Sequence, residues 1–147
     1  MPDPAHRPLP HESAHLHVAG EAAYVDDLPE LATTLHAALG LSTQARARIT
    51  GLDLAPVLAA PGVVGVLVAA DIPGINDCGP IVHDDPIRAD GEVCYAGQPI
   101  FAVLAEDRDA ARRAARLARI EYEPLSACLD PLEAHRLGDH VAPPMHL

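Results

Sequence analysis

Val63-Val-Gly-Val-Leu-Val68 is the clearest strand in the sequence. It is an apolar run rich in β-branched valine, and Pro61-Gly62 stops the preceding segment directly before it. A run of this length is too short for a buried helix and is typical of a strand that is buried on both faces. We therefore expect residues 63–68 to form a central strand.

On either side of this strand, turn signals divide the chain into short strands and helices. Further strands are predicted over residues 34–41, 45–50, 93–96, 100–105 and 119–123. The alanine and leucine content of residues 34–41 leaves a helix as the alternative there. Asp53 and Asp107 are suitable N-caps for helices that run to Ala60 and to about Ala118. This order of elements indicates an α+β fold rather than a regular βαβ repeat.

The predicted helix that begins at Asp107 has two different faces. Its alanines recur at helical spacing and can pack closely on a sheet, while arginines follow at steps of three or four on another face. These arginines are Arg108, Arg112, Arg116 and Arg119. Such a stripe is usually a solvated face, and the alternative is a surface that binds an acidic partner.

Length and charge exclude several classes of function. The 147 residues predict one domain. All ten cationic residues are arginine, which excludes a phosphate-loop lysine, a lysine Schiff base and covalent attachment of biotin or lipoate. The net charge of −11 argues against nucleic acid and anionic membranes as partners. No apolar stretch is long enough for a signal peptide or a membrane span, and a cytoplasmic location is expected.

Two groups of residues near the N-terminus are candidates for chemical sites. His11, His15 and His17 could place imidazoles on one helical face for a metal, but no further ligands complete the set, which favours a mobile polar arm. Asp26 and Asp27 pair two carboxylates, yet adjacent residues of an extended chain point to opposite sides. A turn cap is therefore the better interpretation of these two residues.

Residues 71–91 form a predicted loop that is rich in Asp, Pro and Gly. It is longer than an ordinary connection, so it is either functional or covered by a partner. His83-Asp84-Asp85 could collect a divalent cation together with Asp77 and Asp90. A solvated acidic loop is the simpler interpretation.

Gly97-Gln98-Pro99 reads as a tight turn that needs glycine, and its amide side chain could be buried and reach a neighbour. Cys78, Cys94 and Cys128 are widely spaced and form no C-x-x-C pair, so neither a disulfide framework nor a zinc or iron–sulfur signature is present. We expect these cysteines to be small core residues rather than nucleophiles.

Taken in order, the motifs of this chain resemble one known family. The motifs are Arg7-Pro-Leu-Pro-His11, Gly20-Glu-Ala-Ala-Tyr24-Val-Asp26-Asp27-Leu-Pro29, Ser42-Thr-x-Ala45-Arg-Ala-Arg-Ile49, Ala60-Pro-Gly-Val63, Asp71-Ile-Pro-Gly74-Ile-Asn76, Gly91-Glu-Val93, Tyr95-x-Gly97-Gln98-Pro99-Ile100 and Ile120-Glu-Tyr122-Glu-Pro-Leu125. From about Arg7 to Pro144 the sequence resembles the N-terminal α/β hammerhead domain of the large, molybdenum-binding subunit of the xanthine dehydrogenase and aldehyde oxidase family.

This resemblance implies a fold and a division of the chain. The fold is α+β, an α/β hammerhead with a mixed sheet and two packed helices. Residues 1–17 are an extended N-terminal arm, residues 18–130 the hammerhead domain, and residues 131–147 a linker toward a molybdopterin-binding region that is absent here. The chain is then a fragment or an isolated domain.

The resemblance also implies an activity for the complete enzyme, the hydroxylation of purines such as hypoxanthine and xanthine to urate. A glutamate acts as base, and electrons pass through 2Fe-2S clusters to FAD and then to NAD. That glutamate lies in a Gly-x-Gly-Glu context, which Gly20-Glu21 and Gly91-Glu92 lack. We therefore assign no catalytic, cofactor-binding or metal-ligating residue to this chain.

The expected role of the chain is that of an inactive scaffold. Its expected partners are the molybdopterin-binding region of the same subunit and the iron–sulfur/FAD subunit. An exposed apolar docking face is predicted, which would permit homo-oligomers. Two alternatives remain: an aldehyde oxidase or other molybdenum hydroxylase, and a free-standing acidic interaction module that uses residues 71–90.

Overall fold

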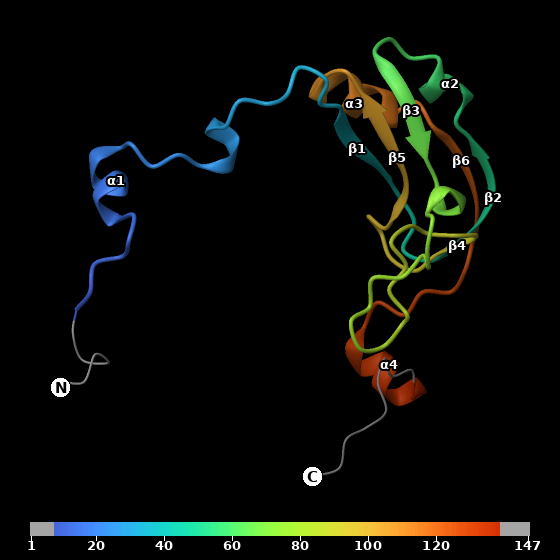
Figure 1. The fold of residues 1–147 in the computed structure, drawn as a ribbon. Helices are drawn as coiled ribbons and strands as arrows, with labels where there is room; N and C mark the ends of the chain where they lie inside the picture. The colour runs from blue at the N-terminus through green and yellow to red at the C-terminus, as the bar shows by residue number, and fades with distance from the viewer. Residues whose placement is uncertain (1–7, 139–147) are drawn as a thin grey trace. The chain divides into compact units, whose positions relative to one another are not determined.

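The structure is a computed structural model that describes residues 8–138. These residues fall into two compact units, one ending at Thr34 and the other beginning at Leu35. The first unit contains the helix α1 (Ala14–Ala19) and the 3-10 helix η2 (Val25–Asp27), both seen in Figure 1. Part of the segment predicted to be extended, residues 14–17, is therefore helical.

The second unit contains two three-stranded antiparallel sheets (Figure 1). The first sheet has the order β1-β5-β3, and the second has the order β4-β2-β6. The strands are β1 (His36–Leu41), β2 (Ala47–Asp53), β3 (Val63–Leu67), β4 (Glu92–Val93), β5 (Pro99–Ala105) and β6 (Arg119–Pro124). All predicted strands are present, and residues 36–41 form a strand rather than the alternative helix.

The α+β class is confirmed, but the single mixed sheet is replaced by two antiparallel ones. The reason lies in β6. The strand β5, the helix α3 (Arg108–Ala115) and β6 follow one another as in a βαβ unit, yet β6 pairs antiparallel with β2 instead of lying parallel to β5. The pairing places Arg48 opposite Glu123, and an ion pair joins their side chains.

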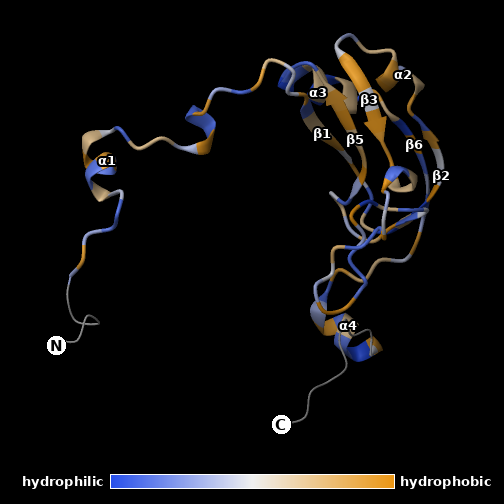
Figure 2. Ribbon diagram, viewed as in Figure 1, coloured by the Kyte–Doolittle hydropathy of each residue, from blue (hydrophilic) through white to orange (hydrophobic). Residues whose placement is uncertain are grey.

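The strand at residues 63–68 is not central, contrary to the sequence prediction. β3 is an edge strand, and β5 lies between β1 and β3. Most of β5 is buried, whereas Val64 and Leu67 of β3 are exposed. Valine favours a strand because its branched side chain suits a pleated surface, and this preference does not fix the strand's place in the sheet. Figure 2 shows that β3 and β5 are both strongly apolar.

The helix α3 packs on β1 and β5. Its buried residues are Ala110, Ala111 and Ala114, as the spacing of small side chains predicted. The carboxylate of Asp107 accepts a hydrogen bond from the amide of Ala110 at 2.7 Å, which confirms the predicted N-cap. Phe101 of β5, fully buried, is the largest side chain of the core.

The remaining helices are short. α2 (Ala55–Leu58) begins one residue later than predicted, although the carboxylate of Asp53 still accepts a hydrogen bond from the amide of Ala55 at 3.0 Å. η3 (Ala69–Asp71) opens the long loop, and α4 (Pro131–Leu137) lies within the segment expected to be a linker, whose first part is therefore helical. Among residues 8–138, no helix has the length and apolar character needed to cross a bilayer.

Candidate functional site

The histidines of the first unit take part in ring and hydrogen-bond contacts. The rings of His11 and His17 meet edge to face, with 6.1 Å between their centroids. Nδ1 of His17 lies 3.2 Å from the hydroxyl of Tyr24, and Nδ1 of His11 lies 2.9 Å from the hydroxyl of Ser13. Within the described part of the chain, no three His, Cys, Asp or Glu side chains are placed to hold a metal ion together.

Asp27 is the turn cap that the sequence predicted. Its Oδ2 accepts a hydrogen bond from the amide of Tyr24 at 2.9 Å, at the start of η2. The carboxylate therefore satisfies a backbone donor at a helix start, which is the ordinary use of Asp in such a position.

The loop after η3 is held by side-chain to backbone hydrogen bonds. The amide of Asn76 donates to the carbonyl of Arg88 at 2.7 Å, and its oxygen accepts from the amide of Arg88 at 3.0 Å. Asp77 accepts from the amide of Gly79 through Oδ1, and its Oδ2 lies 3.1 Å from Nδ1 of His83. Both oxygens of Asp77 are thus engaged within the loop.

The other acidic residues of this loop do not join Asp77 in a ligand set. Asp85 lies beside Cys78, whose amide donates to the carbonyl of Asp85 at 2.9 Å. Asp84 and Asp90 belong to no group of three potential metal ligands among residues 8–138. What the structure brings together in this loop are two separate pairs, His83 with Asp77 and Cys78 with Asp85.

The three cysteines are exposed, so the prediction that they are core residues is wrong. Cys78, Cys94 and Cys128 all lie outside the helices and strands, in segments that no second layer covers. Desolvation, together with the hydrogen bond and charge of Asp85, raises the pKa of the Cys78 thiol. Since the thiolate is the nucleophilic form, this environment disfavours nucleophilic catalysis by Cys78.

Gln98 is buried, with 2% of the residue exposed, and its side chain reaches a neighbour as predicted. Its Oε1 accepts a hydrogen bond from the amide of Cys94 at 2.6 Å. Gly97 has a φ of +91°, and its amide donates to the carbonyl of Ser42 at 2.8 Å. These bonds close the turn between β4 and β5 and attach it to the end of β1, which is a structural role.

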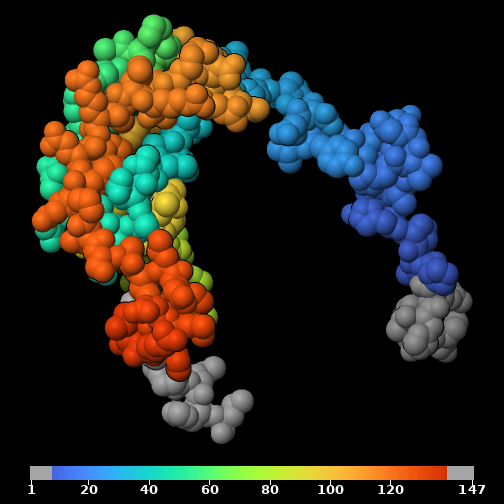
Figure 3. Space-filling model, turned by 180° about the vertical axis from the view of Figure 1, so that it is seen from behind, coloured from blue at the N-terminus to red at the C-terminus, as the bar shows by residue number. Residues whose placement is uncertain are grey.

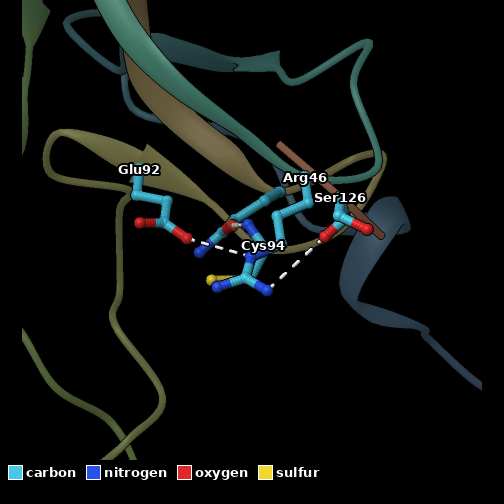
Figure 4. Close-up of polar contacts among 5 residues, drawn as sticks. Arg46, Glu92, Cys94 and Ser126 are labelled. Atoms are coloured by element: carbon cyan, nitrogen blue, oxygen red, sulfur yellow. Dashed lines mark hydrogen bonds and ion pairs between the residues drawn. The ribbon is translucent and has the colours of Figure 1, made fainter. Parts of the chain in front are cut away.

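Arg46 makes two contacts that the sequence did not reveal (Figure 4). Its Nε lies 3.1 Å from a carboxylate oxygen of Glu92, and its Nη1 donates to the carbonyl of Ser126 at 3.5 Å. Alternation along the strand placed Arg46 on the solvent side, and it is exposed. Its partners are distant in sequence, so only the folded structure identifies them.

A groove with a volume of about 710 Å³ lies on the surface of the second unit. β1, β5, α3 and β6 contribute to it, and its lining includes Leu39, Leu41, Phe101, Arg112, Arg116 and Tyr122. The hydroxyl of Tyr122 is buried and has no hydrogen-bond partner among the described residues.

Two features of the sequence point toward this groove in retrospect. Ala38, Leu39, Gly40 and Leu41 follow one another along β1, so the leucines lie on one side of the strand, the two small residues lie on the other, and neither side is polar. Arg112 and Arg116 belong to the predicted arginine stripe. The pattern did not reveal that β6 lies close enough to complete a concave surface.

Comparison with known proteins identifies the family. Residues 19–126 match the model of the aldehyde oxidase and xanthine dehydrogenase a/b hammerhead domain. Xanthine dehydrogenase of Oryza sativa subsp. japonica is 44% identical over 132 residues, which cover 90% of this chain and 10% of that protein.

Solved structures agree with this match. The Cu,Mo-CO dehydrogenase in its carbon monoxide reduced state has a TM-score of 0.75 and 32% identity, over 84% of this chain and 16% of that one. The aldehyde oxidoreductase of Desulfovibrio desulfuricans ATCC 27774 has a TM-score of 0.76 and 28% identity, over 84% of this chain and 15% of that one.

The chain spans about a tenth of the length of the curated relatives it matches. The matched region contains both sheets and the helix between β5 and β6, so it includes every strand described above. The predicted hammerhead fold is confirmed, and this chain belongs to the aldehyde oxidase and xanthine dehydrogenase family through its a/b hammerhead domain.

Proposed function

We propose that this chain is the hammerhead domain of a molybdenum hydroxylase that oxidises hypoxanthine and xanthine to urate with NAD as acceptor. The observation that carries the proposal is the 44% identity to the rice xanthine dehydrogenase over 90% of the chain. Oxidation of an aldehyde is the second candidate, because the chain is also similar to a structure named as an aldehyde oxidoreductase.

Within such an enzyme, the chain serves as a scaffold and contributes no catalytic residue. The polar side chains that the structure describes support this role, because they hold turns and helix starts. Asp27 and Asp107 cap helices, Asn76 ties the long loop together, and Gln98 closes the β4–β5 turn. The family's reaction then requires groups that lie outside this chain.

The cofactors of the complete enzyme, molybdopterin, 2Fe-2S clusters and FAD, are proposed to bind elsewhere. Hydroxylation and electron transfer would be the chemistry that they supply when bound. The residues described here do not fit a metal centre, since no three potential ligands converge among residues 8–138. The partners of the domain would be the molybdopterin-binding region of its own subunit and the iron–sulfur/FAD subunit, in the cytoplasm.

A chimera tests the proposal. Residues 19–126 of this chain would replace the matching residues of the rice xanthine dehydrogenase, and molybdenum content and hypoxanthine-dependent NAD reduction would be measured. We expect molybdenum loading and turnover close to those of the unmodified rice enzyme. A chimera that folds but does not load molybdenum would contradict the proposed role.

The isolated chain and the complete enzyme provide the remaining comparisons. The 147-residue chain alone should give no turnover with hypoxanthine or with an aldehyde, and measurable turnover would overturn the scaffold role. The complete enzyme that contains this chain should prefer hypoxanthine, and a preference for aldehydes would establish the second candidate instead.

A further inference from the structure

The groove between β1, α3 and β6 brings exposed apolar and cationic side chains together. Figure 3 shows this region with the teal residues of β1 next to the orange residues of α3 and β6. Its lining includes Leu39 and Leu41, which point away from the face of β1 that carries Gly40 and packs on the buried ring of Phe101. Leu39 and Leu41 are 51% and 48% exposed and lie two residues apart on one face of β1, where they form a continuous exposed apolar surface.

The groove lies between two edge strands. β1 pairs only with β5 in its sheet, and β6 pairs only with β2 in the other. An edge strand has backbone donors and acceptors on its outer side, and extended segments commonly add to such edges. The four residues of β1 that line the groove, Ala38 to Leu41, span roughly 13 Å at about 3.3 Å a residue.

The other side of the groove is cationic. Arg112 of α3 and Arg116, which directly follows the last residue of that helix, lie four residues apart, and both are exposed. Among residues 8–138 no ion pair joins either of them to a carboxylate. In a chain with a net charge of −11, two such arginines beside an apolar surface favour a negatively charged partner with apolar side chains.

We propose that this groove is the docking site of an extended acidic segment that alternates carboxylates with apolar side chains and belongs to the remainder of the complete enzyme. Alternation follows from the two-residue period of an extended chain, which would place apolar side chains against Leu39 and Leu41 and carboxylates near Arg112 and Arg116. About nine tenths of the length of the related enzymes lies outside this chain, so such a segment has an ample source. The identity of the source rests on the proposed function.

The test uses two synthetic probes, acetyl-Glu-Leu-Glu-Phe-Glu-Leu-amide and the same peptide with lysine in place of glutamate. The isotope-labelled 147-residue chain would be titrated with each peptide and followed by NMR. The glutamate peptide should shift the amide signals of β1 and α3, and the lysine peptide should not. Shifts elsewhere, or no shifts at peptide concentrations up to about 5 mM, a ceiling for weak binding, would overturn the proposal.

Matched arginine variants show whether the groove itself is the site. Arg112→Gln with Arg116→Gln should weaken binding of the glutamate peptide by about fivefold or more, in line with two partly exposed charge contacts. Arg108→Gln with Arg113→Gln removes the same charge from α3 outside the groove and should change binding by less than about twofold. Equal losses in the two variants would show general attraction to α3 and would refute the proposal.

Two further outcomes are informative. If the same amides shift on concentrating the chain without peptide, the occupant is a second copy, and the proposed acidic segment is wrong. The chimera described above does not depend on peptide binding. An active chimera together with a silent titration would overturn the groove proposal alone, whereas an inactive chimera would count against the proposed function.

Discussion

Replacing Gly40 by alanine tests how β1 packs on β5. Gly40 lies opposite Phe101 in the antiparallel pair. A Cβ atom added at Gly40 would lie 2.6 Å from Cδ1 of the Phe101 ring and closer still to Cε1 and Cζ. Carbon atoms in favourable contact are about 3.5–4.0 Å apart, so the overlap is about 1 Å or more. The ring is fully buried and cannot turn into solvent to avoid it.

The expected cost follows from two opposing effects. Inserting a methyl group into a packed core lowers the free energy of unfolding by about 1–3 kcal/mol. Replacing glycine stabilises the folded state by about 0.4–1 kcal/mol, because the unfolded chain loses conformational freedom. The net loss should be about 1–2 kcal/mol, which corresponds to a fall in Tm of about 4–8 °C for a chain of this size.

Gly65→Ala in β3 is the matched control. No heavy atom lies within 4 Å of a Cβ added at Gly65, and its φ is not in the left-handed region. This variant should be as stable as the original chain or up to about 1 kcal/mol more stable.

Thermal and urea unfolding, followed by far-UV circular dichroism, would compare the variants. Phe101→Leu should partly relieve the steric overlap in the Gly40→Ala variant. The double variant should then lose at least about 0.5 kcal/mol less free energy of unfolding than the sum of the two single losses. If Gly40→Ala is no less stable than Gly65→Ala, or if the two losses simply add, the close packing of Gly40 on Phe101 is refuted.

Three other changes have expected outcomes. Asp107→Ala should lower the free energy of unfolding by about 1 kcal/mol through loss of the α3 cap, and Asp107→Asn should retain most of the stabilisation by the cap. Equal melting temperatures of the two variants would contradict this. Tyr122→Phe should leave stability unchanged or raise it, because an unsatisfied buried hydroxyl costs about 1–3 kcal/mol, and clear destabilisation in a thermal melt would reveal an unseen partner. In the Asp85→Asn variant, alkylation of Cys78 by iodoacetamide should become fast at a lower pH, because the Asp85 carboxylate raises the pKa of that thiol. The pH dependence of the alkylation rate would be measured by mass spectrometry, and an unchanged dependence would rule out this influence.

Features that depend on a few neighbouring residues could be predicted from the sequence. The cap at Asp107 and the turn at Asp27 are both local, and the structure contains each of them. The order of the elements followed from the same local patterns, but several boundaries differ. The strand predicted over residues 45–50 is Ala47–Asp53, and the helices predicted to run to Ala60 and about Ala118 end at Leu58 and Ala115.

Features that depend on long-range pairing could not be predicted from the residues themselves. The valines of β3 favour a strand strongly, but the place of β3 at the edge is fixed by the pairing of β5 with β1. The cysteines have the polarity of core residues, yet burial requires a second layer that their loops do not receive. For the same reason, the contact of Arg46 with Glu92 has no local signal, and no local pattern reveals that β6 completes the groove beside Tyr122.

The distribution of charge over the chain favours binding of an acidic segment at the groove rather than elsewhere on the surface. Five of the ten arginines lie within residues 108–119, whereas the chain as a whole carries −11. An acidic segment is therefore repelled by most of the molecule and attracted only near α3. At physiological ionic strength charges interact over about 8 Å, so the attraction near α3 and the repulsion elsewhere act only close to the surface. They determine where on the surface the segment binds. The apolar contacts of Leu39 and Leu41 would then determine how long it stays, because burial of apolar area slows dissociation more than it speeds encounter. In this arrangement the acidity of the remaining surface contributes to docking specificity without touching the partner.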